Sequence, residues 1–293
     1  MRISEEKYQQ LKRELNLPSD LQSIFIEEIK QELIFKRDDL INPIVCGNKW
    51  RKLSNHLNFF QSSDKQELIS MGGAFSNHLH ALAYVCFKLE IPCTCLIYGW
   101  NNDFETPTLK DCRNWNATLI PISRVEAQQL RLDPKIFLED RFSNALWIPE
   151  GGGGEIGVQG IANLVSEFPV EFDRQENLIV CACGTGTTIQ GLLTFSENVH
   201  ILSMQVVRMA QYPWIQDSRV KMIDAKLNLS FGKKDESILK FMDLFFLNYG
   251  IRLDPVYTAP LLVSFFEQID KYKYKKIYVL HTGGLQGSRA SIK

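Results

Sequence analysis

Apolar segments of strand length alternate with amphipathic segments of helix length along almost the whole chain. The expected strands are 32–35, 67–71, 92–98, 118–122, 146–149, 177–182, 200–207 and 276–280. The expected helices are 4–15, 49–60, 77–89, 108–115, 157–168, 189–195, 236–248 and 261–272. Alternation at this short spacing indicates βα units, in which helices cover both faces of parallel sheets. The pattern therefore predicts an α/β fold.

The chain has 293 residues, which allows one large domain or two smaller ones. No linker-like stretch separates two halves, so a second domain would be inserted within the first. The chain carries 33 basic and 34 acidic residues, and this balance argues against nucleic acid or an anionic membrane as a partner. The chain has no long apolar run that would predict a membrane span, and its mixed-charge N-terminus is unlike a signal peptide.

Seven cysteines are dispersed along the chain, and no two of them have CxxC spacing. This spacing argues against the common zinc-binding patterns, so we expect no metal site. An odd number of cysteines in apolar segments predicts buried, reduced thiols. Such thiols suit a reducing compartment, so we expect a cytoplasmic protein.

Four glycine-marked loops contain the unusual residues of the chain, and ligands in open α/β folds bind beyond the carboxyl ends of strands. In the loop at 46–49, Lys49 lies at a helix start, where the positive helix end would lower the pKa of its amine. For this segment taken alone, a solvent-facing lysine is the favoured interpretation. In the loop at 72–78, the Ser76 hydroxyl and the first helix amides could bind a carboxylate, although a plain capped helix is the alternative.

The other two glycine-marked loops come later in the chain, after the expected strands 146–149 and 177–182. Residues 150–154 hold four consecutive glycines, which permit either a close approach to a ligand or a simple turn. Residues 183–188 combine glycines, threonine hydroxyls and a helix start, and this combination is typical of a phosphate cradle. No Gly-Lys-Ser/Thr follows, so the loop is not a Walker P-loop.

Six segments, in the same order along the chain, resemble the motifs of the 1-aminocyclopropane-1-carboxylate (ACC) deaminase and D-cysteine desulfhydrase family. They are KRDDL at 36–40 with GNKxRKL at 47–53, GGxxSNH at 72–78, EGG at 150–152, GTGTT at 184–188, LDPVYT at 253–258 and HTGG at 281–284. The resemblance implies the tryptophan synthase β-like, pyridoxal-phosphate (PLP) dependent fold, called fold type II. It also implies a large PLP-binding domain of residues 1–51 and 161–293, a small inserted α/β domain of residues 52–160, and a homodimer.

The resemblance further implies roles for individual side chains. Lys49 would form the Schiff base with PLP and move the proton at the substrate Cα, and Asn77 would bond the PLP ring oxygen. Ser76 would bind the carboxylate of a small amino-acid substrate, and Tyr257 would face that substrate. The other residues expected to bind the cofactor are Asn48, Gly184, Thr185, Gly186, Thr187, Thr188, Thr258 and Thr282, and His78 is expected to bind the substrate together with Ser76, Asn77 and Tyr257.

Two hydroxyl residues bear on the choice of activity. ACC deaminases resemble one another in having a carboxylate at the position of Thr258, and they tend to have an apolar residue at that of Thr282. Hydroxyls at both positions resemble the D-cysteine desulfhydrase branch. A neutral partner leaves the pyridine nitrogen less protonated, and this weaker electron sink suffices for elimination of thiolate. We therefore expect a lyase that converts D-cysteine or a similar amino acid to pyruvate, ammonia and sulfide, with ACC deamination as the alternative.

Several departures from the family pattern keep a third interpretation open. Phe231 stands where the family usually has a second active-site tyrosine, and Ala259-Pro260 replaces the usual Gly-Lys. His80 stands where arginine is common, and Trp50 is bulkier than the usual neighbour of the lysine. These changes would also fit a non-catalytic PLP-binding homologue.

Overall fold

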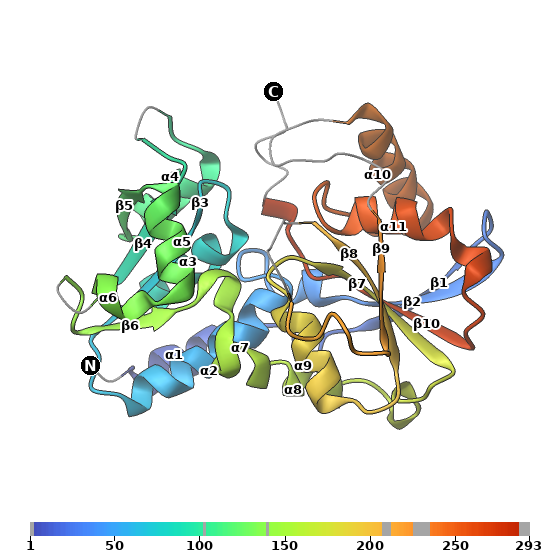
Figure 1. The fold of residues 1–293 in the computed structure, drawn as a ribbon, viewed down its shortest axis with the longest axis horizontal. Helices are drawn as coiled ribbons and strands as arrows, with labels where there is room; N and C mark the ends of the chain where they lie inside the picture. The colour runs from blue at the N-terminus through green and yellow to red at the C-terminus, as the bar shows by residue number, and fades with distance from the viewer. Residues whose placement is uncertain (1–2, 102–103, 139–140, 207–211, 225–234, 287–293) are drawn as a thin grey trace. The chain divides into compact units, whose positions relative to one another are not determined.

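The computed structural model describes residues 3–101, 104–138, 141–206, 212–224 and 235–286. The contacts of the chain divide it into two compact units, whose elements are labelled in Figure 1. Unit 1 comprises Met1–Asn16 and Lys49–Gly160, and unit 2 comprises Leu17–Asn48 and Ile161–Lys293. The N-terminal segment thus belongs to unit 1, whereas the predicted large domain included it.

Unit 1 is built on a four-stranded parallel sheet with the order β5-β4-β3-β6. Its strands are β3 (Glu67–Gly73), β4 (Cys93–Tyr98), β5 (Thr118–Ile122) and β6 (Ala145–Ile148). Its helices are α1 (Glu5–Arg13), α2 (Asn48–Ser62), α3 (Asn77–Leu89), α4 (Pro107–Asn114), α5 (Arg124–Leu132), α6 (Pro134–Leu138), the 3-10 turn η2 (Glu150–Gly152) and α7 (Gly154–Gln159). Strand residues such as Met71 and Leu96 pack against Leu130 of α5 and form a hydrophobic cluster.

A row of four buried thiols crosses the interior of unit 1. Cys93 and Cys95 lie on one face of β4, and their sulfur atoms are 4.0 Å apart. A hydrogen bond with Cys86 of α3, together with burial, raises the pKa of Cys93 well above its ordinary value. A hydrogen bond with Cys95, together with burial, does the same for Cys112 of α4. All seven cysteines are buried and unpaired by disulfides, which confirms the predicted reduced thiols.

Unit 2 contains a six-stranded sheet with the order β1-β2-β10-β7-β8-β9. Only the β1–β2 pair is antiparallel among these pairings. The strands are β1 (Leu21–Ile26), β2 (Gln31–Lys36), β7 (Asn177–Cys183), β8 (His200–Gln205), β9 (Val220–Ile223) and β10 (Lys276–Leu280). The helical elements are η1 (Asp38–Leu40), α8 (Ala162–Ser166), η3 (Val170–Phe172), α9 (Thr187–Phe195), α10 (Glu236–Tyr249), α11 (Thr258–Phe266) and η4 (Ile269–Lys271).

Strand β7 is the core of unit 2, because every one of its residues is buried. Its alternate side chains enter two different hydrophobic clusters. Val180 belongs to the cluster that contains Phe245 of α10 and Phe265 of α11, and these two helices lie on one side of the sheet in Figure 1. Cys181 faces the cluster that contains Leu192 of α9 on the other side. Helices on both faces explain why β7 is continuously apolar in sequence.

The structure corrects the predicted elements in several places. Strands β1 and β9 and helix α5 lie in segments where no element was predicted. The helix expected over 157–168 is divided into α7 and α8. A side chain at Gly160 would place its Cβ 2.1 Å from the backbone oxygen of Arg51, so the chain turns where only glycine fits. The last predicted helix starts earlier than residue 261, at Thr258, and ends at Phe266.

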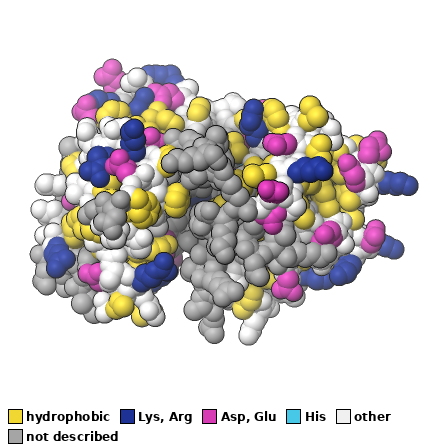
Figure 2. Space-filling view, turned by 90° about the horizontal axis from the view of Figure 1, so that it is seen from above, with side chains coloured by type: hydrophobic (Ala, Val, Ile, Leu, Met, Phe, Trp, Pro, Cys, Tyr) yellow, Lys and Arg dark blue, Asp and Glu magenta, His cyan; other side chains and the backbone are white. Residues whose placement is uncertain are grey.

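The surface carries charges of both signs. On the face shown in Figure 2, basic and acidic side chains are interspersed with hydrophobic ones among the coloured residues. In the described part of the chain, no helix is long and apolar enough to cross a membrane. Within the same residues, no group of three or more histidine, cysteine or acidic side chains could hold a metal ion.

Candidate active site

Two residues before Lys49, the chain has a glycine, Gly47, that no other residue could replace without a backbone shift. Gly47 has a φ of +66°, and a Cβ at this position would lie 1.7 Å from the backbone oxygen of Thr282. The N–H of Gly47 donates to the carbonyl oxygen of Asp38 at 2.7 Å. Helix α2 then begins at Asn48, so Lys49 is in its first turn, as predicted. The HTGG motif at 281–284 therefore lies directly against Gly47, the residue that precedes Asn48.

The Asn48 side chain ties this junction to the glycine–threonine loop. Its Nδ2 donates to Thr188 Oγ1 at 2.8 Å, and both side chains are buried. Asn48 is the first residue of α2. The residue directly before Lys49 is therefore fixed to the end of the predicted phosphate loop.

The KRDDL segment supports this junction rather than presenting charges to solvent. Lys36 is fully buried, and its ammonium donates to Glu167 Oε2 at 2.7 Å and to the Ser19 carbonyl at 2.5 Å. The Ser19 hydroxyl donates to Asp38 Oδ1 at 2.6 Å. Arg37 forms two hydrogen bonds with the carboxylate of Asp39, at 2.9 and 2.7 Å. Buried, paired charges of this kind stabilise one arrangement of a loop, because breaking either partner leaves the other uncompensated.

The glycine–threonine loop has the geometry of an anion cradle. It connects β7 to α9, and Gly186 precedes the helix with a φ of +82°. The Thr185 and Thr187 hydroxyls are hydrogen-bonded to each other at 3.1 Å. The first N–H groups of α9 lack acceptors within the helix and carry its positive partial charge. Backbone donors and hydroxyls at such a terminus suit a phosphate group.

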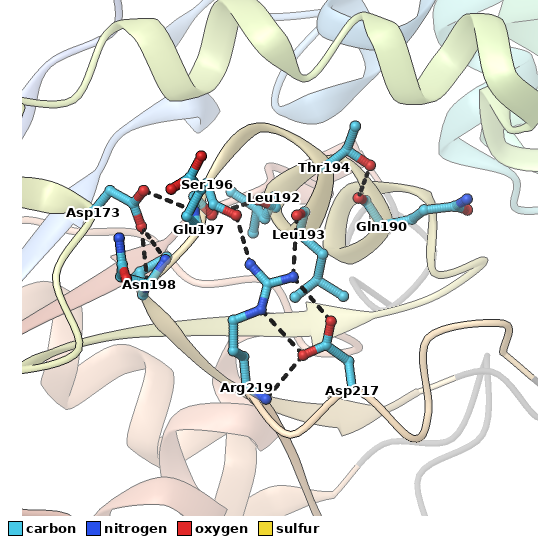
Figure 3. A network of polar contacts seen from close by, with 11 residues as sticks. Asp173, Gln190, Leu192, Leu193, Thr194, Ser196, Glu197, Asn198, Asp217 and Arg219 are labelled. Carbon is cyan, nitrogen blue, oxygen red and sulfur yellow. Dashed lines mark hydrogen bonds and ion pairs between the residues drawn. The ribbon is translucent and has the colours of Figure 1, made fainter.

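Figure 3 shows how the opposite end of α9 is held. Arg219 donates to the carbonyl oxygens of Leu193 at 3.2 Å and Ser196 at 2.6 Å, so a cation closes the carboxyl end of the helix. The guanidinium also bonds both carboxylate oxygens of Asp217 and holds the pKa of that carboxyl below its usual value. Both ends of α9 are thus fixed, which fixes the loop before it.

Beyond this helix end, the carboxylate of Asp173 accepts three backbone N–H groups. They belong to residues 197–199, at 2.7, 2.7 and 2.9 Å. Burial raises the pKa of this carboxyl, but the three donors outweigh burial and leave the pKa below its usual value. Asp173 therefore anchors the turn between α9 and β8.

Asp254 positions Tyr257 and Thr258. This fully buried carboxylate accepts the N–H groups of Val256, Tyr257 and Thr258 at 3.1, 2.6 and 2.9 Å. The Tyr257 ring lies 3.5 Å from the position of a Cβ at Gly184. In unit 2, Asn48, Tyr257 and Thr282 are thus each connected to the glycine–threonine loop or to the junction beside it.

The second predicted loop lies in unit 1 and starts helix α3. Ser76 is its N-cap, with Oγ accepting the N–H of Leu79 at 3.3 Å, and its contact with a substrate carboxylate stays a prediction. Asn77 is the first helical residue. Its Oδ1 is buried and has no hydrogen-bond partner among the residues that the structure describes. A buried amide without a partner is unusual in a folded protein and fits a ligand contact.

His78 is inside unit 1 and not on its surface. Its Nε2 is 2.9 Å from the hydroxyl of Ser70, and the side chain is 2% exposed. Burial, followed by the positive charge of Lys49, holds the pKa of His78 well below its usual range. The charge of Lys49 thus contributes to the lowered pKa of His78, the residue that follows Asn77. The internal hydrogen bond with Ser70 occupies one of the two ring nitrogens, and the contact of His78 with a substrate stays a prediction.

The four-glycine turn packs against α2. A Cβ at Gly152 would lie 3.1 Å from Lys52 Cβ, and one at Gly157 would lie 1.9 Å from the Gly152 oxygen. The His56 Nε2–H donates to the Gly153 oxygen at 3.2 Å. Before the turn, Glu150 accepts hydrogen bonds at 2.7 Å from Tyr98 and from Arg131. The glycines therefore serve close packing within unit 1.

Sequence reasoning did not single out several residues that the structure places around these loops. They are Ser19, His56, Asp173, Arg219 and the capping Asp254. The Asp254–Pro255 pair before a helix is a turn and cap signal that could have indicated its role. The others act through contacts between segments far apart in the chain. Phe231 lies outside the described residues.

A model of the family described as "pyridoxal-phosphate dependent enzyme" matches residues 18–283, and the chain belongs to this family, whose cofactor is PLP. A solved structure described as an ACC deaminase homologue is 22% identical, with a TM-score of 0.74 over 98% of this chain and 97% of that one. Serine racemase from Dictyostelium discoideum is 15% identical, with a TM-score of 0.68 over 95% and 96%. A hydrogen sulfide-producing enzyme from Fusobacterium nucleatum is 11% identical, with a TM-score of 0.61 over 92% and 96%.

These likenesses concern the fold, and they confirm the predicted tryptophan synthase β-like architecture of fold type II. The residues present also fit the cofactor. The loop before α9 has the donors that a phosphate needs, and Asn77 has a buried amide oxygen without a partner in the described structure. Lys49 directly follows Asn48, whose side chain donates a hydrogen bond to Thr188 of this loop.

Proposed function

We propose that this PLP-dependent enzyme is a lyase that eliminates the β-substituent of a small amino acid, with D-cysteine as the favoured substrate. One water is consumed, and pyruvate, ammonia and hydrogen sulfide are released. The observation that supports the cofactor site in this proposal is the hydrogen bond from Asn48 to Thr188, because it connects the residue before Lys49 with the loop proposed to hold the phosphate. When bound, PLP supplies an electron sink for negative charge at the substrate Cα.

The chain's own groups have distinct roles in this proposal. Lys49 attaches the cofactor, and its amine takes the proton from Cα. Ser76 and the first amides of α3 bind the substrate carboxylate, because a helix N-terminus attracts anions. Asn77 bonds the ring oxygen of the cofactor, and Tyr257 faces the substrate. The loop from Gly184 to Thr188 holds the phosphate together with Asn48.

The choice of leaving group depends on Thr258 and Thr282. Both residues are buried and neutral, at positions where ACC deaminases have a carboxylate and an apolar side chain. A neutral partner for the ring nitrogen favours departure of a good leaving group such as thiolate. A structure of the same fold described as a hydrogen sulfide-producing enzyme is consistent with this choice. Another, described as an ACC deaminase homologue, keeps ACC deamination as the second candidate.

The cofactor attachment is tested by the Lys49→Ala variant. The purified wild type with PLP should show the visible absorbance of lysine-bound PLP, and Lys49→Ala should lack it. The control is Lys65→Ala, since the Lys65 ammonium donates to the carbonyl of Ser143 at the exposed surface of unit 1. If Lys49→Ala keeps the band, a different lysine is the anchor.

The substrate is tested with a panel of D- and L-amino acids and ACC, with detection of keto acid and sulfide. Pyruvate and sulfide in equal amounts from D-cysteine support the proposal. Keto acid from ACC alone would instead support the second candidate. No keto acid from any member of the panel, at full cofactor occupancy, would support a non-catalytic PLP-binding protein.

A further inference from the structure

An aromatic pair that belongs to none of the glycine motifs packs against the glycine–threonine loop. Tyr212 and Trp214 stack with ring centroids 4.7 Å apart and planes within 14°. Both side chains are buried and join the hydrophobic cluster that contains α9. They lie beyond β8, far along the chain from the loop that they contact.

The pair and Gly186 are matched in shape. A Cβ at Gly186 would lie 2.7 Å from Tyr212 Cδ1 and 3.1 Å from Trp214 Cζ2. Together with the φ of +82°, this contact means that only glycine fits at this position. The aromatic rings thus occupy the space next to the loop, and the loop has no freedom to move toward them.

The Tyr212 hydroxyl fixes one peptide of the loop directly. It donates to the carbonyl oxygen of Gly184 at 2.8 Å. The C=O and N–H of a trans peptide point in opposite directions, so holding the Gly184 oxygen also orients the N–H of Thr185 away from Tyr212. Burial, followed by a hydrogen bond with Cys183, raises the pKa of Tyr212, so its hydroxyl remains a donor at neutral pH.

We propose that Tyr212 is a positioning residue for the cofactor phosphate: it aims the Thr185 N–H through the Gly184 carbonyl, and Trp214 holds its ring in place. This inference rests on the proposed role of residues 184–188 as the phosphate site. Tyr212 itself does not touch the cofactor. Its effect should therefore depend on the phosphate group of the ligand and not on the aldehyde.

The test compares PLP with pyridoxal, which has the same aldehyde and ring but no phosphate. Each is titrated into the full-length protein freed of cofactor, and binding is followed by the visible absorbance of the lysine-bound form. In Tyr212→Phe, the dissociation constant of PLP should rise about fivefold, as for the loss of one neutral hydrogen bond. The dissociation constant of pyridoxal should stay within twofold of the wild-type value.

Tyr278→Phe is the matched control. Tyr278 lies in the same hydrophobic cluster, and its buried hydroxyl has no hydrogen-bond partner in the described part of the chain. This variant should bind both ligands as the wild type does. Trp214→Leu keeps the Tyr212 hydroxyl but removes the ring behind it, so it should weaken PLP binding more than pyridoxal binding as well.

Two outcomes would overturn the inference. Equal weakening of PLP and pyridoxal in Tyr212→Phe would mean that the tyrosine has only a general structural role. Unchanged binding of both ligands would mean that the Gly184 carbonyl needs no anchor. A different result concerns the proposed function itself. If Thr188→Ala and Gly186→Ala leave PLP binding intact, the phosphate site is elsewhere, whatever Tyr212 does.

Discussion

His56 offers a quantitative test of how the interior of unit 1 is stabilised. The side chain is 1% exposed, and its Nε2 donates to the Gly153 oxygen. Burial lowers its pKa from 6.5 to about 4. In the unfolded chain, the same imidazole takes up a proton near pH 6.5. Folding therefore releases a proton between these two pH values.

The sign and size follow from proton linkage. Because the unfolded chain binds more protons, the stabilisation is present above pH 6.5 and is lost as the pH falls from 6.5 toward 4. The full difference between the two pKa values corresponds to about 3 kcal/mol, of which about 2 kcal/mol is lost between pH 7.5 and pH 5.0. The pKa of His78 is also lowered by burial, so the wild type should lose still more than this amount.

We expect the His56→Gln variant to remove the His56 contribution. A glutamine amide can donate to the Gly153 oxygen but does not titrate. Free energies of unfolding are measured by urea denaturation and tryptophan fluorescence at several pH values between 7.5 and 5.0. The wild type should lose about 2 kcal/mol more than the variant over this range. Parallel pH profiles for the two proteins would refute the reasoning, because they would mean that His56 already titrates normally when folded.

Two further predictions concern the site in unit 2. Gly47→Ala should prevent formation of lysine-bound PLP, because the new Cβ would lie 1.7 Å from the Thr282 oxygen. Gly250→Ala is the control: Gly250 has a similar φ of +69°, but a Cβ there would have no atom within 4 Å. The control should lower the free energy of unfolding by only about 1 kcal/mol. Equal effects of these two variants would show that φ alone matters at Gly47. Thr258→Glu should shift the ratio of the two activities from D-cysteine toward ACC, and an unchanged ratio would contradict the argument from the ring nitrogen.

The sequence predicted those parts of the fold that depend on local pattern. The buried strand β7 and the glycine loop after it were evident because a strand covered on both faces is continuously apolar. Strand β1 was missed because most of its side chains are exposed or half-buried and it lies at the edge of the sheet. Helix α5 was missed although Ser123 and Glu126 form a capping box, a signal that is readable in sequence.

The supporting contacts of the site were beyond local pattern. The motif positions of Lys49 and Asn77 could be identified, but the bond from Asn48 to Thr188 joins residues 140 positions apart. The close approach of the Tyr212 ring to Gly186 and the hydrogen bond from Lys36 to Glu167 also depend on tertiary packing. No periodicity or spacing encodes such pairs, because each partner is fixed by the packing of other elements.

The buried row of thiols in unit 1 has a consequence for a protein proposed to generate sulfide. The reactive form of cysteine is the thiolate, and Cys93 and Cys112 are kept protonated by their neighbours and by burial. Since all seven cysteines are buried, a released sulfur species meets no exposed thiol on this chain. Conversion of a cysteine thiol and sulfide to a persulfide would in addition require a two-electron oxidant, because both sulfur atoms start fully reduced. Because these thiols are buried, their rate of alkylation by an added reagent would measure how often the protein opens enough to expose them.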